Sequence, residues 1–441
     1  MSRRRAALPS EPVVAQIQSF SHDGRGVARI EGKAVFVAGA LPGETVRLRY
    51  RARRRRHDEG EVLDVLVPSP DRVAPRCAHF GVCGGCSLQH QAPSAQVGAK
   101  QQALLDALSH IGKTEPDTVF APLLNAEPWG YRRKARLGVK FVAKKDRVLV
   151  GFRERGSSFV ADLHECHVLH PRIAAVLPHL ADLIAGLSVA RQVPQIEVAM
   201  DDARLVLVFR VLESPGPADR ATLSAFAAAH DLAVYLQPGG PDTVGPLDEP
   251  LDLHYTLPQF GLDLAFLPGD FTQVNTDINR QMVGRAVELL APDRTERVLD
   301  LFCGVGNFTL PLATRAGEVV GVEGDGGLVQ RARDNAERNG LANVRFHTAN
   351  LYEPLDAEPW LRESFDKALL DPPRSGALEV LPLLPRLGVR RIVYISCYPG
   401  TLARDAGVLV REHGYRLTGA GVMDMFPHTT HVESLAVFER G

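Results

Sequence analysis

The stretch "VLDLFCGVGNFTL", residues 298–310, decides the fold of the second half of the chain. An apolar strand runs into Gly304 and Gly306, and the start of a helix follows directly. Two glycines at this place permit a tight turn and let a ligand approach the backbone closely. A lone pair of glycines is weak evidence, so the prediction of a ligand-binding turn depends on what surrounds it.

Strand-like and helix-like segments alternate from about residue 295 onward. The strand-like segments read RVLDLF, EVVGVE, NVRFHTAN, KALLDPP and RIVYISC. This alternation predicts a parallel sheet with helices on both faces, which is a Rossmann-like α/β domain over residues 271–441. Ligands of such sheets sit at the carboxyl ends of the strands.

Polar residues at those strand ends indicate which ligand the sheet binds. Glu323 closes the strand after the glycine turn, where a carboxylate can bind the two hydroxyls of a ribose. The third glycine of a dinucleotide fingerprint is replaced by Thr309, which disfavours a pyrophosphate and favours an adenosine without phosphates. S-adenosylmethionine fits this description. We expect Asn350 to face the adenine edge and Asp371 to reach the cofactor or the substrate.

The sequence "DPPRSG", residues 371–376, predicts a stiff loop because two consecutive prolines fix φ and prevent a helix start. In nucleic-acid amino-methylases a similar loop carries an aromatic residue after the prolines, which stacks on the target base. Here that residue is Arg374. This difference argues against an exocyclic amino group as the methyl acceptor.

Cys397 ends the strand RIVYIS, so it is expected at the same edge of the sheet as the glycine turn. Pro399 and Gly400 end the strand at once and expose the thiol in a loop. A thiolate helps a methyltransferase whose acceptor atom is a poor nucleophile, as carbon 5 of a pyrimidine is. Attack on carbon 6 then gives an enolate whose carbon 5 can take the methyl group. Cys303, in contrast, is interpreted as a packed small hydrophobe.

This chemistry needs a general base that removes the proton from carbon 5 after methylation. The segment "FPHTTHVESLAVF" offers His428, His431 and Glu433. We favour Glu433 because it enters a strand that can pair into the same sheet. The alternative for Glu433 is a solvated surface carboxylate.

The first part of the chain is strongly basic although the formal net charge of the whole is only -1. Residues 1–56 hold 13 Lys or Arg against 4 Asp or Glu. Five short strand-like segments up to residue 70 predict a small β-barrel of the OB type, a fold that often binds oligonucleotides or serves only for docking. The run Arg51, Arg53, Arg54, Arg55 and Arg56 ends one of these strands and suits phosphates, whereas residues 3–5 are as well explained by a solvated tail.

The sequence pattern of residues 71–270 predicts a central α+β domain. Its "GYRRKARLGVKF" sets Arg132, Arg133, Lys134 and Arg136 beside Tyr131, which suits single-stranded RNA or, equally, a solvated strand face. The chain has no signal peptide core and no apolar stretch that could span a bilayer, which predicts a cytoplasmic protein away from membranes.

Cysteines in that compartment stay reduced, so their spacing points to metal binding or catalysis rather than disulfides. Cys77, Cys83 and Cys86 form C-x5-C-x2-C, and Cys166 in "HECHVLH" supplies a fourth thiol. Four thiolates can hold zinc or an iron-sulfur cluster, and the spacing does not decide between them. The nearby histidines are expected not to be ligands, since four cysteines complete a site.

Together, these motifs resemble the RNA uracil-5 methyltransferases over nearly the whole chain. The combination comprises Phe-x-Gln-x-Asn at residues 271–275, DLFCGVGNFTL, DPPRSG, SCYPGTLARD and the late HVE. The resemblance implies a TRAM-type barrel over residues 1–70, [4Fe-4S] binding by Cys77, Cys83, Cys86 and Cys166, a Cys397 nucleophile and a Glu433 base. It also implies the residues that bind S-adenosylmethionine, namely Gln273, Phe302, Asn307, Glu323, Asn350 and Asp371.

The barrel followed by C-x5-C-x2-C resembles the branch of the family that acts on large-subunit (23S) ribosomal RNA, and we expect a monomer. One departure stands beside the nucleophile, where Tyr398 replaces the asparagine of the usual Ser-Cys-Asn-Pro. Two alternatives stay open: the same chemistry on another rRNA or tRNA uridine, and a redox-responsive RNA-binding protein without turnover.

Overall fold

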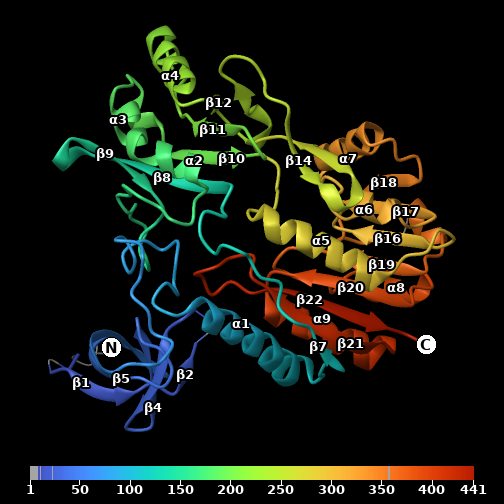
Figure 1. The fold of residues 1–441 in the computed structure, drawn as a ribbon, viewed down its shortest axis with the longest axis horizontal. Coiled ribbons are helices and arrows are strands. Elements are labelled where there is room, and N and C mark those ends of the chain that lie inside the picture. Colours follow the sequence, from blue (N-terminus) through green and yellow to red (C-terminus); the bar gives the residue numbers. More distant parts are fainter. Residues whose placement is uncertain (1–7, 10, 22, 356–357) are drawn as a thin grey trace, which may run out of the picture. The chain divides into compact units, whose positions relative to one another are not determined.

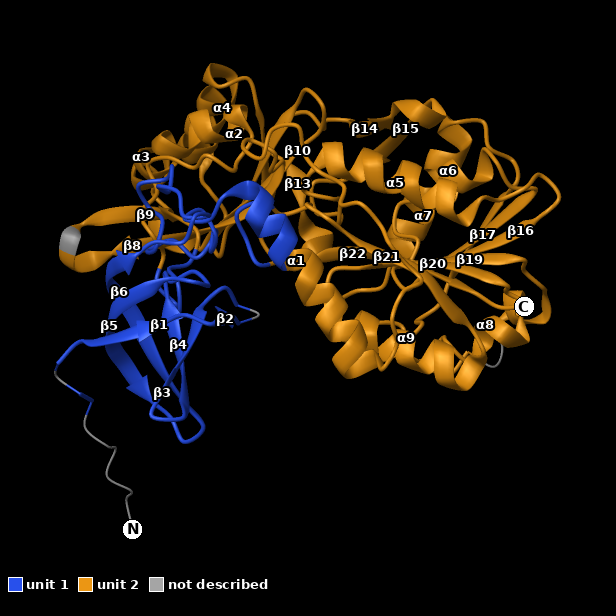
Figure 2. Ribbon diagram, turned by 60° about the horizontal axis from the view of Figure 1, so that its bottom comes forward, with its two compact units in different colours: residues 1–99, 153–159, 427–430 blue, residues 100–152, 160–426, 431–441 orange. Residues whose placement is uncertain are grey.

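The computed structural model describes residues 8–9, 11–21, 23–355 and 358–441, and these form two compact units (Figure 2). Unit 1 comprises residues 1–99, 153–159 and 427–430, and unit 2 comprises residues 100–152, 160–426 and 431–441. Each unit therefore collects segments that are far apart in the sequence. The division into residues 1–70, 71–270 and 271–441 stays a prediction.

Unit 1 contains a small β-barrel built from a six-stranded sheet in the order β1-β5-β6-β4-β3-β2 (Figure 1). Its strands are β1 (Val13–Gln16), β2 (Ser19–Phe20), β3 (Gly26–Ile30), β4 (Lys33–Ala38), β5 (Thr45–Arg53) and β6 (His57–Val67). Alternate side chains of β5 point inward, and Val46, Leu48 and Tyr50 join the barrel core. This period of two is what a half-buried strand requires.

The basic run of β5 differs from the expected free phosphate-binding edge. Arg49 and Arg51 both pair with Glu61 of β6, with nitrogen–oxygen distances of 2.6 Å in each case. Arg54 pairs with Glu59 at 3.2 Å, and Arg53 lies 3.6 Å from Asp58. Acidic residues of "DEGEVLD" thus neutralise much of the edge across the antiparallel β5–β6 pair. Residues 3–5 lie outside the described part of the chain.

Unit 2 begins within the helix α1 (Pro93–Ala107) and contains a mixed sheet in the order β13-β12-β11-β10-β8-β9. The strands are β8 (Lys134–Val142), β9 (Arg147–Gly151), β10 (Gln195–Met200), β11 (Leu205–Arg210), β12 (Ala233–Gln237) and β13 (Gly245–Pro246), with helices α2 (Pro171–Val176), α3 (Leu180–Ala185) and α4 (Pro217–Ala229). The hairpin β14 (Leu253–Leu257) and β15 (Leu262–Phe266) follows.

The basic cluster before β8 is not an exposed stacking surface. Tyr131 is only 8% exposed, and Lys134 is half-buried and donates to the backbone oxygens of Pro268 and Asp270. Arg133 pairs with Asp202 at 2.7 Å, and Arg136 pairs with Glu197 at 2.7 Å. Most of these charges therefore hold unit 2 together.

An eight-stranded sheet dominates unit 2, in the order β18-β17-β16-β19-β20-β22-β21-β7. Five strands are parallel, as the sequence predicts: β16 (Arg297–Leu301), β17 (Glu318–Glu323), β18 (Val344–Thr348), β19 (Lys367–Leu370) and β20 (Arg391–Ser396). The other strands are β7 (Thr118–Val119), β21 (Arg416–Met423) and β22 (Glu433–Glu439), of which β22 runs antiparallel between β20 and β21.

Helices cover both faces of this sheet. In Figure 2, α5 (Thr276–Leu290) and α7 (Gly326–Arg338) lie on one side, and α8 (Leu383–Arg386) and α9 (Pro399–His413) lie on the other. Local signals set the helix ends: the Asp325 side chain caps α7, Pro399 opens α9, and Gly414 at φ 72° closes it. No helix in the described ranges is long and apolar enough to cross a membrane.

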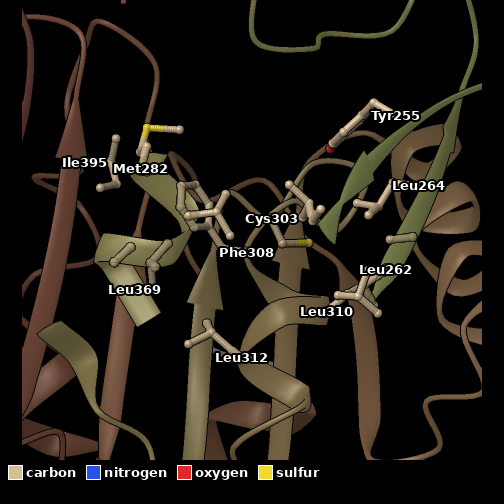
Figure 3. Close-up of a cluster of buried hydrophobic side chains, with 14 of the residues drawn as sticks. Tyr255, Leu262, Leu264, Met282, Cys303, Phe308, Leu310, Leu312, Leu369 and Ile395 are labelled. Atoms are coloured by element: carbon tan, nitrogen blue, oxygen red, sulfur yellow. The ribbon is translucent and has the colours of Figure 1, made fainter. Parts of the chain in front are cut away.

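The main core of unit 2 lies between the sheet, α5 and the β14–β15 hairpin. Cys303 is 3% exposed and lies in this apolar cluster with Phe308 and Leu310 (Figure 3). Burial raises the pKa of the Cys303 thiol well above its ordinary value, so it stays a neutral thiol. This cysteine is packed, as the sequence predicts.

Candidate active site

A cavity of about 620 Å³ opens at the carboxyl edge of the parallel strands. Its lining contains all eight residues of unit 2 that the sequence predicts as catalytic or cofactor-binding: Gln273, Phe302, Asn307, Glu323, Asn350, Asp371, Cys397 and Glu433. A cavity of this size matches pockets that bind drug-sized ligands and cofactors. The roles of the individual residues stay predictions, but their convergence on one cavity is observed.

The turn after β16 has an unusual backbone that opens the cavity floor. Phe302, Gly304 and Gly306 all have positive φ, at 67°, 54° and 93°. A side chain at Gly306 would lie 3.1 Å from Leu310, so glycine is required there by both space and φ. The strained Phe302 is held because its N–H donates to the Val322 oxygen at 2.8 Å.

Glu323 fixes the glycine turn to the end of β17. Its carboxylate accepts hydrogen bonds from the backbone N–H groups of Gly304 at 3.1 Å, Gly324 at 2.7 Å and Asp325 at 3.2 Å. A carboxylate has about four acceptor positions, so capacity remains for a ligand hydroxyl. Glu323 is therefore both a structural clamp and a candidate ribose contact.

The Asn307 amide is already engaged inside the protein. Its oxygen accepts hydrogen bonds from the Tyr255 hydroxyl at 2.9 Å and from Asn279 at 3.0 Å, and its nitrogen donates to the Asn279 oxygen at 3.0 Å. Tyr255 and Asn279 were not predicted from the sequence. They fix the glycine turn from the hairpin and from α5, and only their spatial proximity could have revealed this role.

Asn350 follows β18, as predicted, and is also locally fixed. Its oxygen accepts from the backbone of Tyr352 at 3.1 Å, and its nitrogen donates to Glu353 at 2.8 Å. The Tyr352 ring lies 5.7 Å from the Phe302 ring on the cavity wall. Two aromatic rings on one wall of the cavity suit a flat base.

The Asp-Pro-Pro-Arg loop is fixed from below by a buried carboxylate. Asp405 of α9 is fully buried and accepts hydrogen bonds from the Ala377 backbone at 2.8 Å and the Tyr394 hydroxyl at 2.7 Å. Gly376, at φ 84°, leaves room for the Arg404 and Asp405 side chains. The "LARD" part of the sequence was part of the resemblance, but its buried role could not be read from spacing.

Cys397 and Glu433 are brought together by the antiparallel pairing of β20 and β22. The last residue pair of this ladder joins Ser396 to Ser434, and the Ser434 hydroxyl donates to the Ser396 oxygen at 3.1 Å. Cys397 and Glu433 are the next residues outward on the two strands, and residues opposite each other point to the same face. The thiol and the carboxylate therefore share one wall of the cavity.

Burial makes the ionised forms of these groups costly. It raises the pKa of Cys397 to about 11, with further upward contributions from Glu433 and Asp371 and an opposing one from Arg374. Burial and then Asp371 raise the pKa of Glu433 well above its ordinary value, and burial and then Glu323 raise that of Asp371 to about 7. Strong shifts of titratable groups in one cleft are typical of catalytic sites.

The other two candidate bases lie differently. His428 is buried in unit 1, where its backbone accepts from Ser87 and Leu88 and its N–H donates to Gln96. His431 does line the cavity, but burial and then Arg374 lower its pKa. Arg132 of the basic cluster also lines the cavity, a position that the sequence did not predict.

The cysteine loop of unit 1 is shaped by local hydrogen bonds. Cys83 N–H donates to the His79 oxygen at 2.9 Å, and Cys77 N–H donates to the Gln89 side chain at 3.1 Å. Cys77, Cys83 and Cys86 are half-buried, and Cys166 lies in unit 2. Across the described residues, no group of three or more His, Cys, Asp or Glu is arranged to hold a metal ion.

Comparison with known proteins agrees with this geometry. A family model described as tRNA (Uracil-5-)-methyltransferase matches residues 262–440, and a TRAM domain model matches residues 13–49. A protein of Alkalilimnicola ehrlichii named 23S rRNA (uracil(1939)-C(5))-methyltransferase RlmD is 57% identical over 100% of this chain and 99% of its own length. A protein of Nitrosococcus oceani with the same name is 56% identical over 99% and 98%.

The chain belongs to the RNA uracil-5 methyltransferase family. It is therefore a methyltransferase that depends on S-adenosylmethionine, with an N-terminal TRAM barrel. The fold of this family is seen in a crystal structure of the Pyrococcus abyssi tRNA (uracil-54, C5)-methyltransferase in complex with S-adenosyl-L-homocysteine. That structure has a TM-score of 0.72 and 24% identity, and the match covers 97% of this chain and 100% of the other.

Proposed function

We propose that this family member methylates carbon 5 of a uridine in 23S ribosomal RNA, through a covalent adduct between Cys397 and carbon 6. The observation that supports the proposal most is that Cys397 and Glu433 line one cavity and stand next to Ser396 and Ser434, the last residues paired between β20 and β22. The choice of 23S RNA is supported by the relatives at 57% and 56% identity, which are named as 23S rRNA methyltransferases.

The residues of the glycine turn fit S-adenosylmethionine. Glu323 retains acceptor capacity, the backbone at Gly304 is open to a ligand because a side chain there would meet nothing within 4 Å, and the rings of Phe302 and Tyr352 suit adenine. Asn350, Asn307 and Gln273 complete the proposed contacts. When bound, this cofactor supplies the methyl group as an electrophilic carbon.

Cys397 begins the proposed reaction. Its Sγ–H bond breaks, the proton leaves to solvent, and the thiolate forms a bond to carbon 6 while the carbon 5–carbon 6 π electrons move toward oxygen 4. The resulting enolate places electron density on carbon 5, to which a bound S-adenosylmethionine would supply its methyl group, with loss of the methyl–sulfur bond and S-adenosylhomocysteine as the leaving group. A uridine must be extruded from its stack to reach this cavity.

Glu433 ends the proposed reaction. Its carboxylate accepts the remaining proton of carbon 5, the double bond re-forms, and the bond between Sγ and carbon 6 breaks to release the thiolate. The raised pKa of Glu433 makes it a stronger base than an ordinary carboxylate once it is ionised. Asp371, which also lines the cavity, is proposed to contact the cofactor or the uracil edge.

We further propose that Cys77, Cys83, Cys86 and Cys166 hold a [4Fe-4S] cluster. Three of these thiols lie within one hydrogen-bonded loop, which supports a shared ligand, while Cys166 is proposed from the sequence alone. Anaerobically purified protein should contain iron and absorb near 400 nm, about where iron-sulfur charge transfer falls. Stoichiometric zinc without that band would overturn the cluster.

The deciding experiment incubates the protein with S-adenosylmethionine and either unmodified 23S RNA or unmodified tRNA. The RNA is then digested, and nucleosides are measured by mass spectrometry. Formation of 5-methyluridine from 23S RNA alone is expected. Methylation of tRNA would move the substrate to another member of the RNA class, and binding of both RNAs without methylation would favour an RNA-binding protein without turnover.

A further inference from the structure

A second charged residue lies close to the proposed nucleophile. Arg374 follows Asp371-Pro372-Pro373 and lines the same cavity as Cys397. Its guanidinium carbon lies 5.7 Å from the centroid of the Tyr398 ring, which is the geometry of a cation–π contact. No ion pair of Arg374 is found within the described ranges, so the tyrosine ring is the contact that can orient this long side chain.

The Tyr398 ring is itself held in place by its backbone. Tyr398 directly precedes α9, its N–H donates to the Ser396 hydroxyl at 3.2 Å, and its carbonyl accepts from the Thr401 hydroxyl at 3.2 Å. Glycine at 400 makes room for the ring, because a Cβ there would be 2.8 Å from Tyr398 Cε1. The ring nevertheless stays 42% exposed, so burial in the core does not explain its position.

Two carboxyl groups near the Cys397 thiol make its ionised form costly, and a nearby cation offsets this cost. Glu433 of β22 and Asp371 after β19 both disfavour the thiolate, while Arg374 is the cation that favours it. The other titratable groups that line the cavity are Arg132, Glu323 and His431, together with the hydroxyls of Tyr255 and Tyr352. Burial lowers the pKa of His431, which keeps this histidine neutral near pH 7.

We propose that Tyr398 is a positioning residue whose ring holds the Arg374 guanidinium at the cavity wall, where the cation stabilises the Cys397 thiolate. When the Sγ–H bond breaks, the proton leaves to water and the electron pair stays on Sγ beside the guanidinium. The asparagine that is usual at this position in the family cannot form a cation–π contact. The inference rests on the proposed role of Cys397 as nucleophile.

The test measures alkylation of Cys397 by iodoacetamide between pH 6 and pH 10, in full-length protein without RNA or S-adenosylmethionine. Mass spectrometry of the peptide that contains Cys397 separates this thiol from the other five cysteines. Four variants are compared with the wild type: Tyr398→Phe, Tyr398→Leu, Arg374→Met and the double variant Tyr398→Leu/Arg374→Met. Circular dichroism checks that each variant is folded.

Tyr398→Phe keeps an aromatic face and should reproduce the wild-type pH profile. Tyr398→Leu should shift the profile to higher pH and slow alkylation at pH 8 by about two- to fivefold, the size of an exposed cation–π contact. Arg374→Met should slow it more, and adding Tyr398→Leu to Arg374→Met should change nothing further, because the two residues act as one unit.

Three outcomes would overturn the inference: an unshifted profile for Tyr398→Leu, a Tyr398→Phe profile as slow as that of Tyr398→Leu, or additive effects in the double variant. If Tyr398→Leu does not fold, Tyr398→Asn takes its place, because it also removes the aromatic face, and an unshifted profile for Tyr398→Asn would overturn the inference. Because alkylation needs neither RNA nor cofactor, absence of 5-methyluridine would reject the proposed function without touching this result.

Discussion

Charged residues are arranged in opposite ways on the barrel of unit 1 and in the cavity of unit 2. On the barrel, Glu61 pairs with two arginines across β5 and β6 at 2.6 Å, and the pairs are partly exposed to solvent. In the cavity, Asp371 and Glu433 lie near each other and near a thiol, and burial raises the pKa of both carboxyl groups. Paired charges mark a scaffold, whereas like charges gathered in a buried cleft cost stability and are typical of a site that does chemistry.

The largest expected effect comes from removing the thiol. Cys397→Ala should lower the rate of methylation by at least about 10⁴-fold, because a nucleophile that acts with a base is not replaced by either partner alone. Single-turnover formation of 5-methyluridine measures the rate. S-adenosylmethionine affinity, measured by calorimetry, should stay near that of the wild type. Residual turnover within tenfold of the wild type would remove covalent catalysis from the cavity.

Removing the base should stop the reaction one step later. Glu433→Gln should lower turnover by about 10²- to 10⁴-fold, a usual range for general bases, and should accumulate protein–RNA adduct on a denaturing gel. Because its pKa is raised, Glu433 becomes protonated and inactive as the pH falls, so wild-type turnover should rise with pH. Loss of turnover without any adduct in Glu433→Gln would argue for a role in binding instead.

A buried carboxylate of the barrel should affect stability and not chemistry. Glu44 is fully buried and accepts hydrogen bonds from Arg72 at 2.5 and 2.8 Å, Leu41 at 2.8 Å and Ser69 at 3.3 Å. Glu44→Gln should cost about 3 to 5 kcal/mol of unfolding free energy, the usual cost of breaking a buried ion pair. Scanning calorimetry of the barrel transition measures this cost.

The pH dependence of that cost follows from the pKa of Glu44. Burial alone would raise this pKa, but hydrogen bonds from Arg72, Leu41 and Ser69 lower it. A lowered folded-state pKa gives stability that is present above the unfolded value and is lost as the pH falls through the folded value. The wild type and Glu44→Gln should therefore converge in acid. A difference that grows toward low pH would contradict this reasoning.

The smallest expected effect comes from the partly exposed ion pairs of Glu61 with Arg49 and Arg51. Glu61→Gln should change unfolding free energy by less than about 1 kcal/mol, because exposed ion pairs contribute little. It should release Arg49 and Arg51 for phosphates and strengthen RNA binding about two- to fivefold, with a steeper salt dependence. Fluorescence anisotropy with a single-stranded RNA at several salt concentrations tests this. Unchanged or weaker binding would show that the barrel face does not contact RNA.

The sequence predicted the cavity well because its residues follow from strand order. Glu323 ends β17, and Asp371 and Cys397 directly follow β19 and β20. Parallel strands end at one edge of the sheet, so the three residues meet there. The place of Glu433 in the sheet could also be predicted, because the strand-like segment that begins there was expected to pair into the same sheet. The hydrogen-bond partners of Asn307 could not be predicted from the sequence, because Tyr255 and Asn279 belong to distant segments of the chain.

The basic segments were harder to interpret because composition does not show which charges face each other. Arg51 was expected to bind phosphates, yet it forms an ion pair with Glu61 of the neighbouring strand. Tyr131 was weighed as a stacking surface and is buried, while Arg132 beside it reaches the cavity. The short strand β7 (Thr118–Val119) likewise joins the large sheet through a pairing with β21 that no local pattern predicts.

The segment between Pro427 and Glu433 has a consequence for how the protein is made. Residues 427–430 belong to unit 1, where His428 and Thr430 form hydrogen bonds with Ser87 and Leu88. Glu433 follows three residues later, opens β22 and lines the cavity together with Cys397. Domains usually fold in order as a chain leaves the ribosome. Here the nascent chain already contains the barrel and Cys397 but still lacks residues 427–430 of unit 1 and residues 431–441 of unit 2. Synthesis of one short late segment completes both at nearly the same moment, so an unfinished chain has no assembled active site.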